Sequence, residues 1–354
     1  MVQMRTAIIY SQRYLEHKTE GDHPERPQRL MAIMDGIRRS RLLEDERIRL
    51  IEPDYASLED LGLVHTEEHI RVIRRLCDAG GGLISEETPV SKESFEVARL
   101  AAGGAIGAVQ KVISGNFRSA FALVRPPGHH AGPNYSLGFC VFNNVALAAK
   151  HLIKHYGLRR ILILDIDAHH GNGTQEVFYD TSEVLYISIH EDPTDFPGTG
   201  FAREVGVDEG DGYTVNIPLP YGSGDPAYWK ALKKIVLPII EQYRPQFMLI
   251  SAGFDGYYMD NVSELCLSAY MYPKVFQVTL DLARELCDGR LVAVLEGGYS
   301  LHFLRRVVAA CIAKMAGITI RMREKRPPIN YEAEKEAEKV IGVVRKIQLK
   351  YWSL

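Results

Sequence analysis

Short, uniformly apolar runs alternate with segments of helical length along most of this chain. Runs that are apolar at consecutive positions are typical of strands covered on both faces of a parallel sheet. We expect strands at residues 6–10, 121–124, 161–165, 184–189, 213–217, 247–252 and 291–295. We expect helices at residues 27–40, 66–79, 91–114, 144–155, 226–243, 272–287 and 301–316. This order predicts an α/β fold with a doubly wound, mainly parallel sheet flanked by helices.

Local signals mark several helix ends and argue against a division of the chain. Thr66 and Ser91 are expected N-caps, and Gly157 is expected just beyond a helix end. No long linker rich in Pro, Gly or Ser interrupts the 354 residues, so we expect one catalytic domain over residues 1–320. Residues 321–354 are expected to form a charged helical extension, packed on or trailing this domain. Alternating Glu and Lys from residue 331 predict a solvent-facing helix with i,i+4 charge pairs.

Composition narrows the class of protein and of partner. The chain is 46% hydrophobic and 25% charged, with a formal net charge of −3 and no basic block, which argues against direct nucleic-acid binding. Its five cysteines are widely spaced and form no C-x-x-C pair, so neither a disulfide framework nor a thiolate zinc site is indicated. No signal peptide and no membrane-spanning apolar run is evident, and we expect a cytoplasmic protein. The oligomeric state stays open.

Three potential metal ligands lie at the end of the predicted strand 161–165, the first of them on its last residue. Asp165, Asp167 and His169 are spaced two apart, which in extended backbone places all three side chains on one face. Carboxylates and an imidazole beyond a buried strand are expensive to desolvate unless a partner such as a divalent cation is present. A helix cap or a hydrogen-bonded core histidine would explain a single such residue. Four titratable groups within residues 165–170 favour a metal.

Polar residues also follow three other predicted strands. His129 and His130 come after strand 121–124, Asp255 after strand 247–252, and Tyr299 after strand 291–295. Ligands bind outside the carboxyl ends of the strands in open α/β sheets. Helix caps would explain one or two of these segments, whereas four of them together predict one shared site.

The chemistry of these groups suggests a role for each. Asp167, His169 and Asp255 would be the metal ligands, and three protein ligands leave positions open for water and substrate, as in catalytic sites. Zn²⁺ and Fe²⁺ both suit this set. Asp165 would lie behind the ligands, where it would orient a neighbouring histidine or bind another cation. His170 should point to the opposite face and is interpreted as structural.

The remaining polar groups predict an amide hydrolase. The pair His129 and His130 suits general acid–base work on a metal-activated water. Two neighbouring imidazoles cannot both be charged cheaply in a dry site, so at least one should be neutral near pH 7. Tyr299 can donate its hydroxyl to a developing oxyanion. Neither a G-x-S-x-G elbow nor a Cys/His nucleophile signature competes, which leaves direct attack by metal-activated water.

Several sequence blocks resemble one enzyme family. The blocks are RPPGHH, GFCVFNN, LDIDAHHGNGTQ, SAGFD and LEGGY, together with HPERP at residues 23–27. They cover the chain from about residue 10 to 315 and resemble the arginase/deacetylase superfamily, specifically the metal-dependent histone deacetylases. LEGGY and Asn172 look like class II deacetylases, bacterial deacetylase-like proteins and acetylpolyamine amidohydrolases.

This resemblance implies catalytic roles that agree with those argued above. It implies zinc or iron on the three ligands, with His130 handling the protons of water and leaving amine and His129 as its electrostatic partner. Tyr299 would polarise the acetyl carbonyl, and Asp165 would hydrogen-bond His129. Asn172 would pair with His130 where class I deacetylases have Asp. A neutral amide stabilises imidazolium less than a carboxylate does, so we expect a lower pKa for His130.

The resemblance also implies residues that bind substrate and potassium. Gly138, Phe139, Phe196 and Gly298 would form the acyl-lysine tunnel, with Arg26 and Cys140 in an inner channel, although core packing or capping would explain several of them. A structural K⁺ would bind Asp165 and Ser188 with the backbone carbonyls of Asp167 and His169. A second K⁺ would lie near Phe178, Thr181, Val184 and Tyr213.

The expected substrate is an acetyl- or acyl-lysine side chain of a protein. An acidic loop at residues 190–196, with Asp260 and Glu264, would favour a cationic substrate at the tunnel mouth, although an ordinary solvated acidic loop explains this composition equally well. An acetylated polyamine is therefore the alternative, although residues 77–91 carry no long insertion of the kind that narrows the entrance of acetylpolyamine amidohydrolases. A catalytically silent acyl-lysine-binding protein is a more distant alternative. An arginase-type ureohydrolase would need a two-metal cluster, which the chain does not supply.

Overall fold

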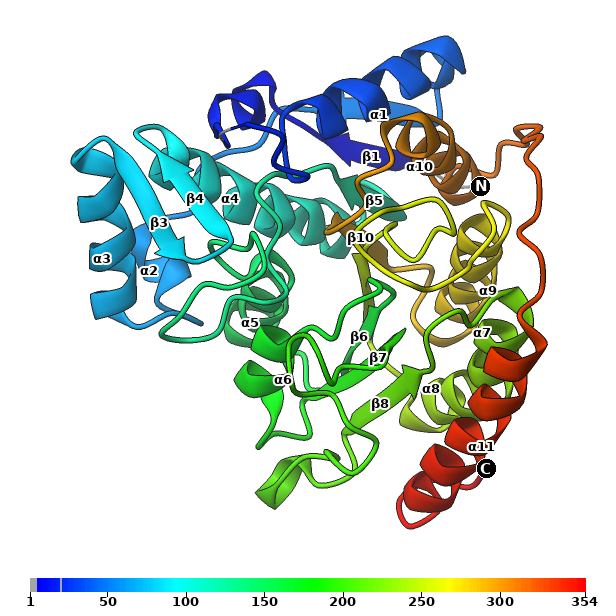
Figure 1. Ribbon diagram of the computed structural model, residues 1–354. Helices are drawn as coiled ribbons and strands as arrows, with labels where there is room; N and C mark the ends of the chain where they lie inside the picture. The colour runs from blue at the N-terminus through cyan, green and yellow to red at the C-terminus, as the bar shows by residue number, and fades with distance from the viewer. Residues whose placement is uncertain (1–4, 20) are drawn as a thin grey trace.

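An eight-stranded parallel sheet forms the centre of the protein (Figure 1). The computed structural model describes residues 5–19 and 21–354. In spatial order the strands are β2 (Ile48–Ile51), β1 (Thr6–Ile9), β5 (Ser119–Ala122), β10 (Leu291–Leu295), β9 (Phe247–Ala252), β6 (Ile161–Asp165), β7 (Val184–Glu191) and β8 (Thr214–Leu219). Every neighbouring pair is parallel. The predicted α/β fold is confirmed.

Helices cover both faces of this sheet. They are α1 (Gln28–Arg39), α2 (Leu58–Leu61), α3 (Glu67–Asp78), α4 (Ser94–Ile113), α5 (Asn144–Tyr156), α6 (Asn172–Phe178), α7 (Asp225–Ala231), α8 (Leu237–Tyr243), α9 (Met271–Leu286), α10 (Leu301–Met315) and α11 (Tyr331–Gln348). Helix α4 packs on β1, β5, β10 and α5, whereas α10 packs on α1 and α9. Because all residues of β5, β6, β7, β9 and β10 are buried, their apolar runs have no solvent-facing side. Among the described residues, no helix has the length and apolar character needed to cross a membrane.

Three strands were not predicted. Strand β2 is a short edge strand, and its exposed Arg49 and Leu50 break the apolar pattern that marks the central strands. Strands β3 (Gly81–Ser85) and β4 (Thr88–Ser91) form a separate antiparallel hairpin within residues 77–91, where no strand was expected. Ser91 therefore ends a strand, and the prediction that it caps α4 is wrong. Thr66 and Gly157 do occupy the predicted cap positions.

The helix predicted over residues 226–243 is interrupted in its middle. A π turn spans Leu232–Val236 between α7 and α8. Pro238 is the second residue after this turn, and because proline has no backbone N–H it cannot make the hydrogen bond that a continuous α-helix requires there.

Helix α11 lies along α7 and β8, at the lower right of Figure 1. Its residues Ala337, Ile341 and Val344 are buried, so the expectation of a solvent-facing helix holds for one side only. The charged side carries an i,i+3 pair between Glu336 and Lys339 rather than the expected i,i+4 pairs. The boundary at residue 320 stays a prediction.

Candidate metal centre and active site

Four adjacent strands bring the predicted polar segments to one edge of the sheet. Strands β5, β10, β9 and β6 are consecutive neighbours, although they are far apart along the chain. Because all four are parallel, the segments that follow them meet at the same edge. There they surround a cavity of about 310 Å³. It is lined by Glu87, Pro127, His129, His130, Gly138, Phe139, Cys140, Asp167, His169, Asp195, Phe196, Val262, Gly297 and Tyr299.

The three predicted metal ligands converge at this cavity, where Asp167 and His169 line the wall and the fully buried Asp255 lies behind them. One potential ligand atom from each of Asp167, His169 and Asp255 lies within 4.8 Å of the others. The Nδ1 atom of His169 is 3.3 Å from Asp167 Oδ1 and 3.1 Å from Asp255 Oδ2. Burial, and then the charge of Asp167, raise the pKa of the Asp255 carboxyl above its usual range. A divalent cation would relieve this repulsion, so the donor set fits Zn²⁺ or Fe²⁺.

Backbone N–H groups hold the two carboxylates in place. Asp167 Oδ1 accepts from the amide of His169 (3.0 Å), and Asp167 Oδ2 accepts from the amide of Gly297 (2.9 Å). Asp255 Oδ1 accepts from the amide of Ala168 (3.0 Å). A Cβ at Gly297 would lie 2.6 Å from a carboxylate oxygen of each aspartate, so only glycine allows this close approach. The ligand positions thus depend on loops after β6, β9 and β10.

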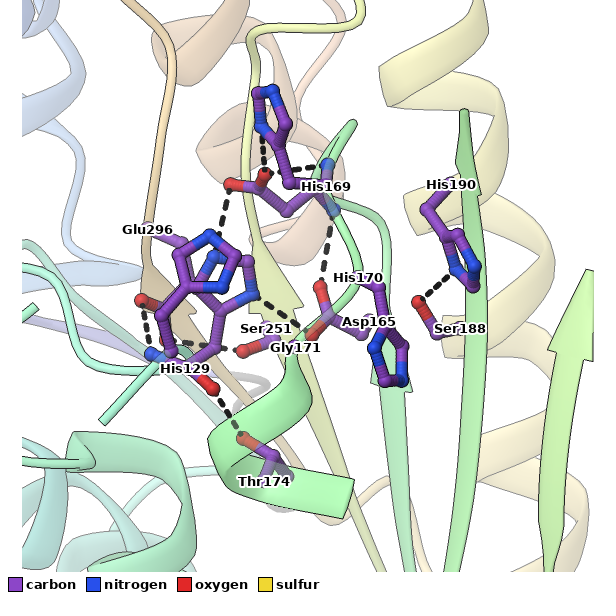
Figure 2. Close-up of polar contacts among 12 residues, drawn as sticks. His129, Asp165, His169, His170, Gly171, Thr174, Ser188, His190, Ser251 and Glu296 are labelled. Atoms are coloured by element: carbon purple, nitrogen blue, oxygen red, sulfur yellow. Dashed lines mark hydrogen bonds and ion pairs between the residues drawn. The ribbon is translucent and has the colours of Figure 1, made fainter. Parts of the chain in front are cut away.

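His129 is held by Asp165 beneath the ligands (Figure 2). Its Nδ1–H donates to Asp165 Oδ2 at 3.0 Å, which is the hydrogen bond that the family resemblance implied. Its Nε2 atom lies 3.8 Å from Asp167 Oδ2. Burial opposes protonation of this ring, but the charges of Asp167 and Asp165 outweigh it and raise the pKa of His129 to about 10.

His130 lies in the opposite electrostatic environment. Its Nδ1–H donates to Asn172 Oδ1 at 2.8 Å, and Asn172 Nδ2 donates to the Tyr135 hydroxyl at 3.0 Å. Its ring centre is 3.9 Å from that of His129. Burial, and then the charge of His129, hold the pKa of His130 well below 6.5. This agrees with the expectation that one of the two imidazoles is neutral near pH 7.

Tyr299 reaches the cavity from the loop after β10. Its backbone N–H donates to Asp260 Oδ2 at 2.7 Å, and the Arg29 guanidinium lies 4.9 Å from its ring centre. Burial raises the pKa of the phenol well above 10, so the hydroxyl is a hydrogen-bond donor. Asp260 also accepts from the amide of Ser300. The expectation that Asp260 lies at the mouth is wrong, because it is turned inward to satisfy these two backbone donors.

Aromatic rings form the walls of the cavity, as the resemblance implied. Phe196 lies 5.0 Å from the ring of His130 and 5.7 Å from that of His169. Phe139 lies 5.7 Å from the ring of Tyr299. Gly138 lines the cavity beside Phe139, whereas Gly298 is not among the lining residues. The carbonyl of Gly298 instead accepts from Arg29 Nε at 2.6 Å.

Of the two residues assigned to an inner channel, one lines the cavity. Cys140 does so, and burial raises the pKa of its thiol well above 9, so it is not a thiolate nucleophile. Arg26 is not among the lining residues. Arg29 is buried instead and donates to the carbonyls of Gly298 and Glu296, behind the Tyr299 loop.

The residues assigned to the two potassium ions form two separate groups, one at the middle of β7 and one near its start. Asp165 pairs with Ser188 across β6 and β7, and the Ser188 hydroxyl donates to His190 Nδ1 at 2.7 Å (Figure 2). Phe178, Thr181, Val184 and Tyr213 lie near the start of β7 and β8. Both potassium sites stay predictions.

His170 turns away from the cavity, as predicted. Figure 2 shows it pointing to the side opposite His169. Its two ring nitrogens contact Thr199 Oγ1 (3.1 Å) and Gln175 Oε1 (3.0 Å), and burial holds its pKa well below 6.5. The ring is a neutral, hydrogen-bonded part of the core.

Two buried carboxylates near the ligands were not predicted. Glu296 accepts from the amides of Gly128 (2.7 Å) and His129 (3.1 Å), and burial raises its pKa to about 7. Glu296 directly precedes the Gly297-Gly298 turn, and this position at the end of a predicted strand could have indicated that it belongs to the site. Glu191 is buried with Oε1 3.5 Å from His169 Nε2. It therefore faces a ligand rather than the mouth, contrary to the expectation for the 190–196 loop.

Acidic groups do border the cavity at two places. Asp195, from the acidic loop, is a lining residue as expected. Glu87, from the turn of the β3–β4 hairpin, is another, and nothing in the local sequence pattern indicated this position. The hairpin thus contributes to the cavity although it lies outside the central sheet.

Comparison with known proteins identifies the family. The family model "Histone deacetylase domain" matches residues 23–315. The chain is 44% identical to a "Probable deacetylase" of Archaeoglobus fulgidus over 99% of both chains. It is 38% identical to a "Histone deacetylase-like amidohydrolase" of Pseudomonas aeruginosa, over 86% of this chain and 78% of the relative. A crystal structure of the HDA15 HD domain superposes with a TM-score of 0.88 at 35% identity, covering 99% of this chain and 95% of the other. The protein therefore belongs to the histone deacetylase family of deacetylases.

Proposed function

We propose that the protein removes acetyl or other acyl groups from lysine side chains of proteins in a zinc-dependent hydrolysis. The observation that carries this proposal is the convergence of Asp167, His169 and Asp255 beside a cavity that His130 and Tyr299 also line. Hydrolysis of an unactivated amide needs an electrophile for the carbonyl oxygen and a base for water, and these groups can supply both.

Asp167, His169 and Asp255 would hold the Zn²⁺, with Fe²⁺ as the alternative. When bound, the ion would supply Lewis-acid polarisation of the acyl carbonyl and would lower the pKa of an attacking water. The orientation of each carboxylate toward the ion is fixed by its backbone donors. K⁺ near Asp165 and Ser188, and a cytoplasmic location, belong to the same proposal.

His130 would be the general base. Because its Nδ1–H is committed to Asn172, the lone pair on Nε2 is free to accept the proton of the attacking water. The charged ring of His129 disfavours a lasting second charge, so His130 would pass this proton on to the leaving amine. His129, held by Asp165, thus acts electrostatically.

Tyr299 would stabilise the oxyanion that develops on the acyl oxygen. Its protonated hydroxyl is a donor, and Asp260 and Arg29 fix the position of its loop and ring. Removing one oxyanion donor typically lowers kcat by roughly 10²–10³-fold.

The shape and charge of the cavity support an acyl group on a cationic carrier. Phe139 and Phe196 offer apolar walls for an aliphatic chain, while Glu87 and Asp195 add negative charge. An acyl-lysine in a basic peptide meets both requirements. An acetylated polyamine meets them too and is the alternative substrate. A silent acyl-lysine-binding protein would not need His130 or Tyr299.

A substrate panel on zinc-loaded protein tests this proposal. The panel contains acetyl-lysine peptides, longer acyl-lysine peptides and acetylpolyamines. We expect the highest kcat/KM on acyl-lysine peptides, with large losses in Tyr299→Phe and His130→Ala. A preference for acetylpolyamines would select the alternative substrate. Absence of turnover of every amide, with metal bound, would refute the enzymatic proposal.

A further inference from the structure

A second cluster of histidine and carboxylate groups lies where α2 meets α5. It consists of Asp60 on α2 and of His151 and His155 on α5, with one potential ligand atom from each within 4.8 Å of the others. None of these residues lines the catalytic cavity. We refer to this group as the α2–α5 cluster.

The two histidines share one face of α5. Their i,i+4 spacing places them one above the other, and their ring centres are 4.4 Å apart. Neighbouring rings at this distance are unfavourable when both are charged. Burial, and then the proximity of His155, lower the pKa of His151 below 6.5. His151 is therefore neutral near pH 7, which is the form that binds metal.

A capping box fixes the carboxylate of Asp60. Its Oδ2 atom accepts from the amide (2.9 Å) and the hydroxyl (2.7 Å) of Ser57, so its Oδ1 atom is directed toward α5. Oδ1 lies 3.8 Å from His151 Nδ1. This distance is too long for a hydrogen bond. Two ligands that each lie about 2.0–2.2 Å from one zinc ion are separated by roughly 3–4 Å.

His151 Nδ1 has no hydrogen-bond partner among the described residues, although the side chain is buried with 8% exposure. An unsatisfied polar atom in such a position is unfavourable and requires an explanation. The Nε2 atom of the same ring contacts Gln110 Nε2 at 3.1 Å. If Nδ1 binds a metal, Nε2 carries the proton, and Gln110 can accept it once its amide turns over. Gln110 would then orient the ligand, as partners behind metal-bound histidines commonly do.

We propose that Asp60, His151 and His155 form a binding site for a divalent transition-metal ion, separate from the catalytic centre. Two imidazoles and one carboxylate suit Zn²⁺, Co²⁺ and Ni²⁺ better than Mg²⁺ or Ca²⁺, which prefer oxygen ligands. Water would complete the coordination on the exposed side. The adjacent Lys154 does not oppose binding strongly, because its charge is paired with Glu59 at 2.8 Å. A bound ion would link α2 to α5.

Equilibrium dialysis against micromolar free Zn²⁺ tests the proposal. The measured quantity is the zinc bound per protein molecule, compared between wild type and variants of the α2–α5 cluster. We expect wild type to bind one more equivalent of zinc than His155→Ala and one more than Asp60→Asn. Asp60 is partly exposed and His155 is exposed, so both variants should fold and retain deacetylase activity. His302→Ala, at another exposed histidine outside any ligand cluster in the described structure, should bind as much zinc as wild type.

A catalytic-centre variant separates the two sites. Asp255→Ala should lose one equivalent and keep the other, and the double variant Asp255→Ala/His155→Ala should lose both. With Co²⁺ as the probe, the visible absorption assigned to the α2–α5 cluster should persist in Asp255→Ala and disappear in His155→Ala. Equal zinc content in wild type, His155→Ala and Asp60→Asn would overturn the proposal, whatever the content of the catalytic site.

Discussion

The cluster at the sheet edge and the α2–α5 cluster use the same residue types but are built in different ways. In the first, Asp167 and Asp255 are fully buried, and three amides from the loops after β6 and β10 hold their oxygens. In the second, one turn of helix and one capping box position Asp60, His151 and His155. The first therefore depends on the whole fold, whereas the second depends on the contact of two helices.

Burial explains this difference. A buried carboxylate needs several donors or a cation to replace the water it loses, so its surroundings must be specified closely. Asp60 is only partly buried, and water can solvate its free oxygen, so this carboxylate does not need a full set of protein donors. We expect substitutions at the sheet edge to affect chemistry and stability strongly, and substitutions in the α2–α5 cluster to affect little besides metal binding.

The largest expected effect follows from Asp255→Ala. Loss of one of three ligands should lower kcat/KM by at least about a thousandfold, equivalent to about 4 kcal/mol of transition-state stabilisation. Steady-state assays on an acyl-lysine peptide measure this change. His155→Ala is the matched control and should retain full activity. Activity of Asp255→Ala within tenfold of wild type would remove the distinction between the two clusters.

The buried carboxylate of Glu25 is held by charged side chains, and its removal should also lower the free energy of unfolding strongly. Glu25 Oε1 accepts from Arg125 Nε (2.6 Å) and pairs with Arg29 (3.2 Å), and all three side chains are buried. Burial raises the pKa of Glu25, but Arg125, His17 and Arg29 together lower it to about 2. Glu25→Gln would leave two buried guanidinium groups without a counter-charge. We expect a loss of about 3–5 kcal/mol in the free energy of unfolding, measured by urea denaturation.

The exposed pair of Arg41 and Glu44 provides the control for this prediction. Glu44→Gln should leave the free energy of unfolding almost unchanged, because solvent screens the pair. The Glu25 contribution should also depend on pH. Its pKa is lower in the folded than in the unfolded state, so the stabilisation is complete above pH 4.5 and is lost as the pH falls toward 2. Equal effects of the two substitutions at pH 7 would contradict the role assigned to burial.

Asn172→Asp tests how the partner of His130 sets the pKa of this ring and the pH dependence of the reaction. Asn172 Oδ1 accepts from His130 at 2.8 Å, so a carboxylate there would stabilise the imidazolium and raise the pKa of His130. His130 must be neutral to accept a proton. The acidic limb of the kcat/KM profile should therefore move to higher pH, whereas Asn172→Ala should not produce that upward shift. An unchanged acidic limb in Asn172→Asp would count against His130 as the base.

The same comparison shows what the sequence could and could not predict. Asp167, His169 and Asp255 were predictable because buried parallel strands are apolar throughout and end in sharply polar segments. Their convergence follows from one rule, that parallel strands end at one edge. No comparable rule joins Asp60 to His151, because their contact depends on how α2 packs against α5.

The direction in which acidic side chains point was the second property that the sequence could not predict. Glu191 and Asp260 lie in segments whose acidic composition predicted a solvent-facing mouth, yet both side chains are turned inward. Asp260 satisfies the amides of Tyr299 and Ser300, and Glu191 accepts from the amide of Glu264. Which loop amides lack partners is a property of the folded backbone. Composition therefore indicated where negative charge is concentrated but not the direction in which it points.

The smallest expected effect is that of His155→Ala on stability in the presence of a metal chelator. His155 is exposed near the end of α5, and alanine is the better helix former, so the free energy of unfolding should change by less than about 0.5 kcal/mol. His65→Ala provides the contrast. The buried His65 ring donates to the carbonyl of Gly132 and accepts from the amide of Asn143, both at 2.9 Å. Its removal should lower the free energy of unfolding by about 1–3 kcal/mol, because buried backbone groups lose their partners.

One outcome would contradict the metal-site proposal. If His155→Ala destabilised the metal-free protein as much as His65→Ala does, the α2–α5 cluster would be a structural element of the apoprotein. Its geometry would then need no ion to explain it.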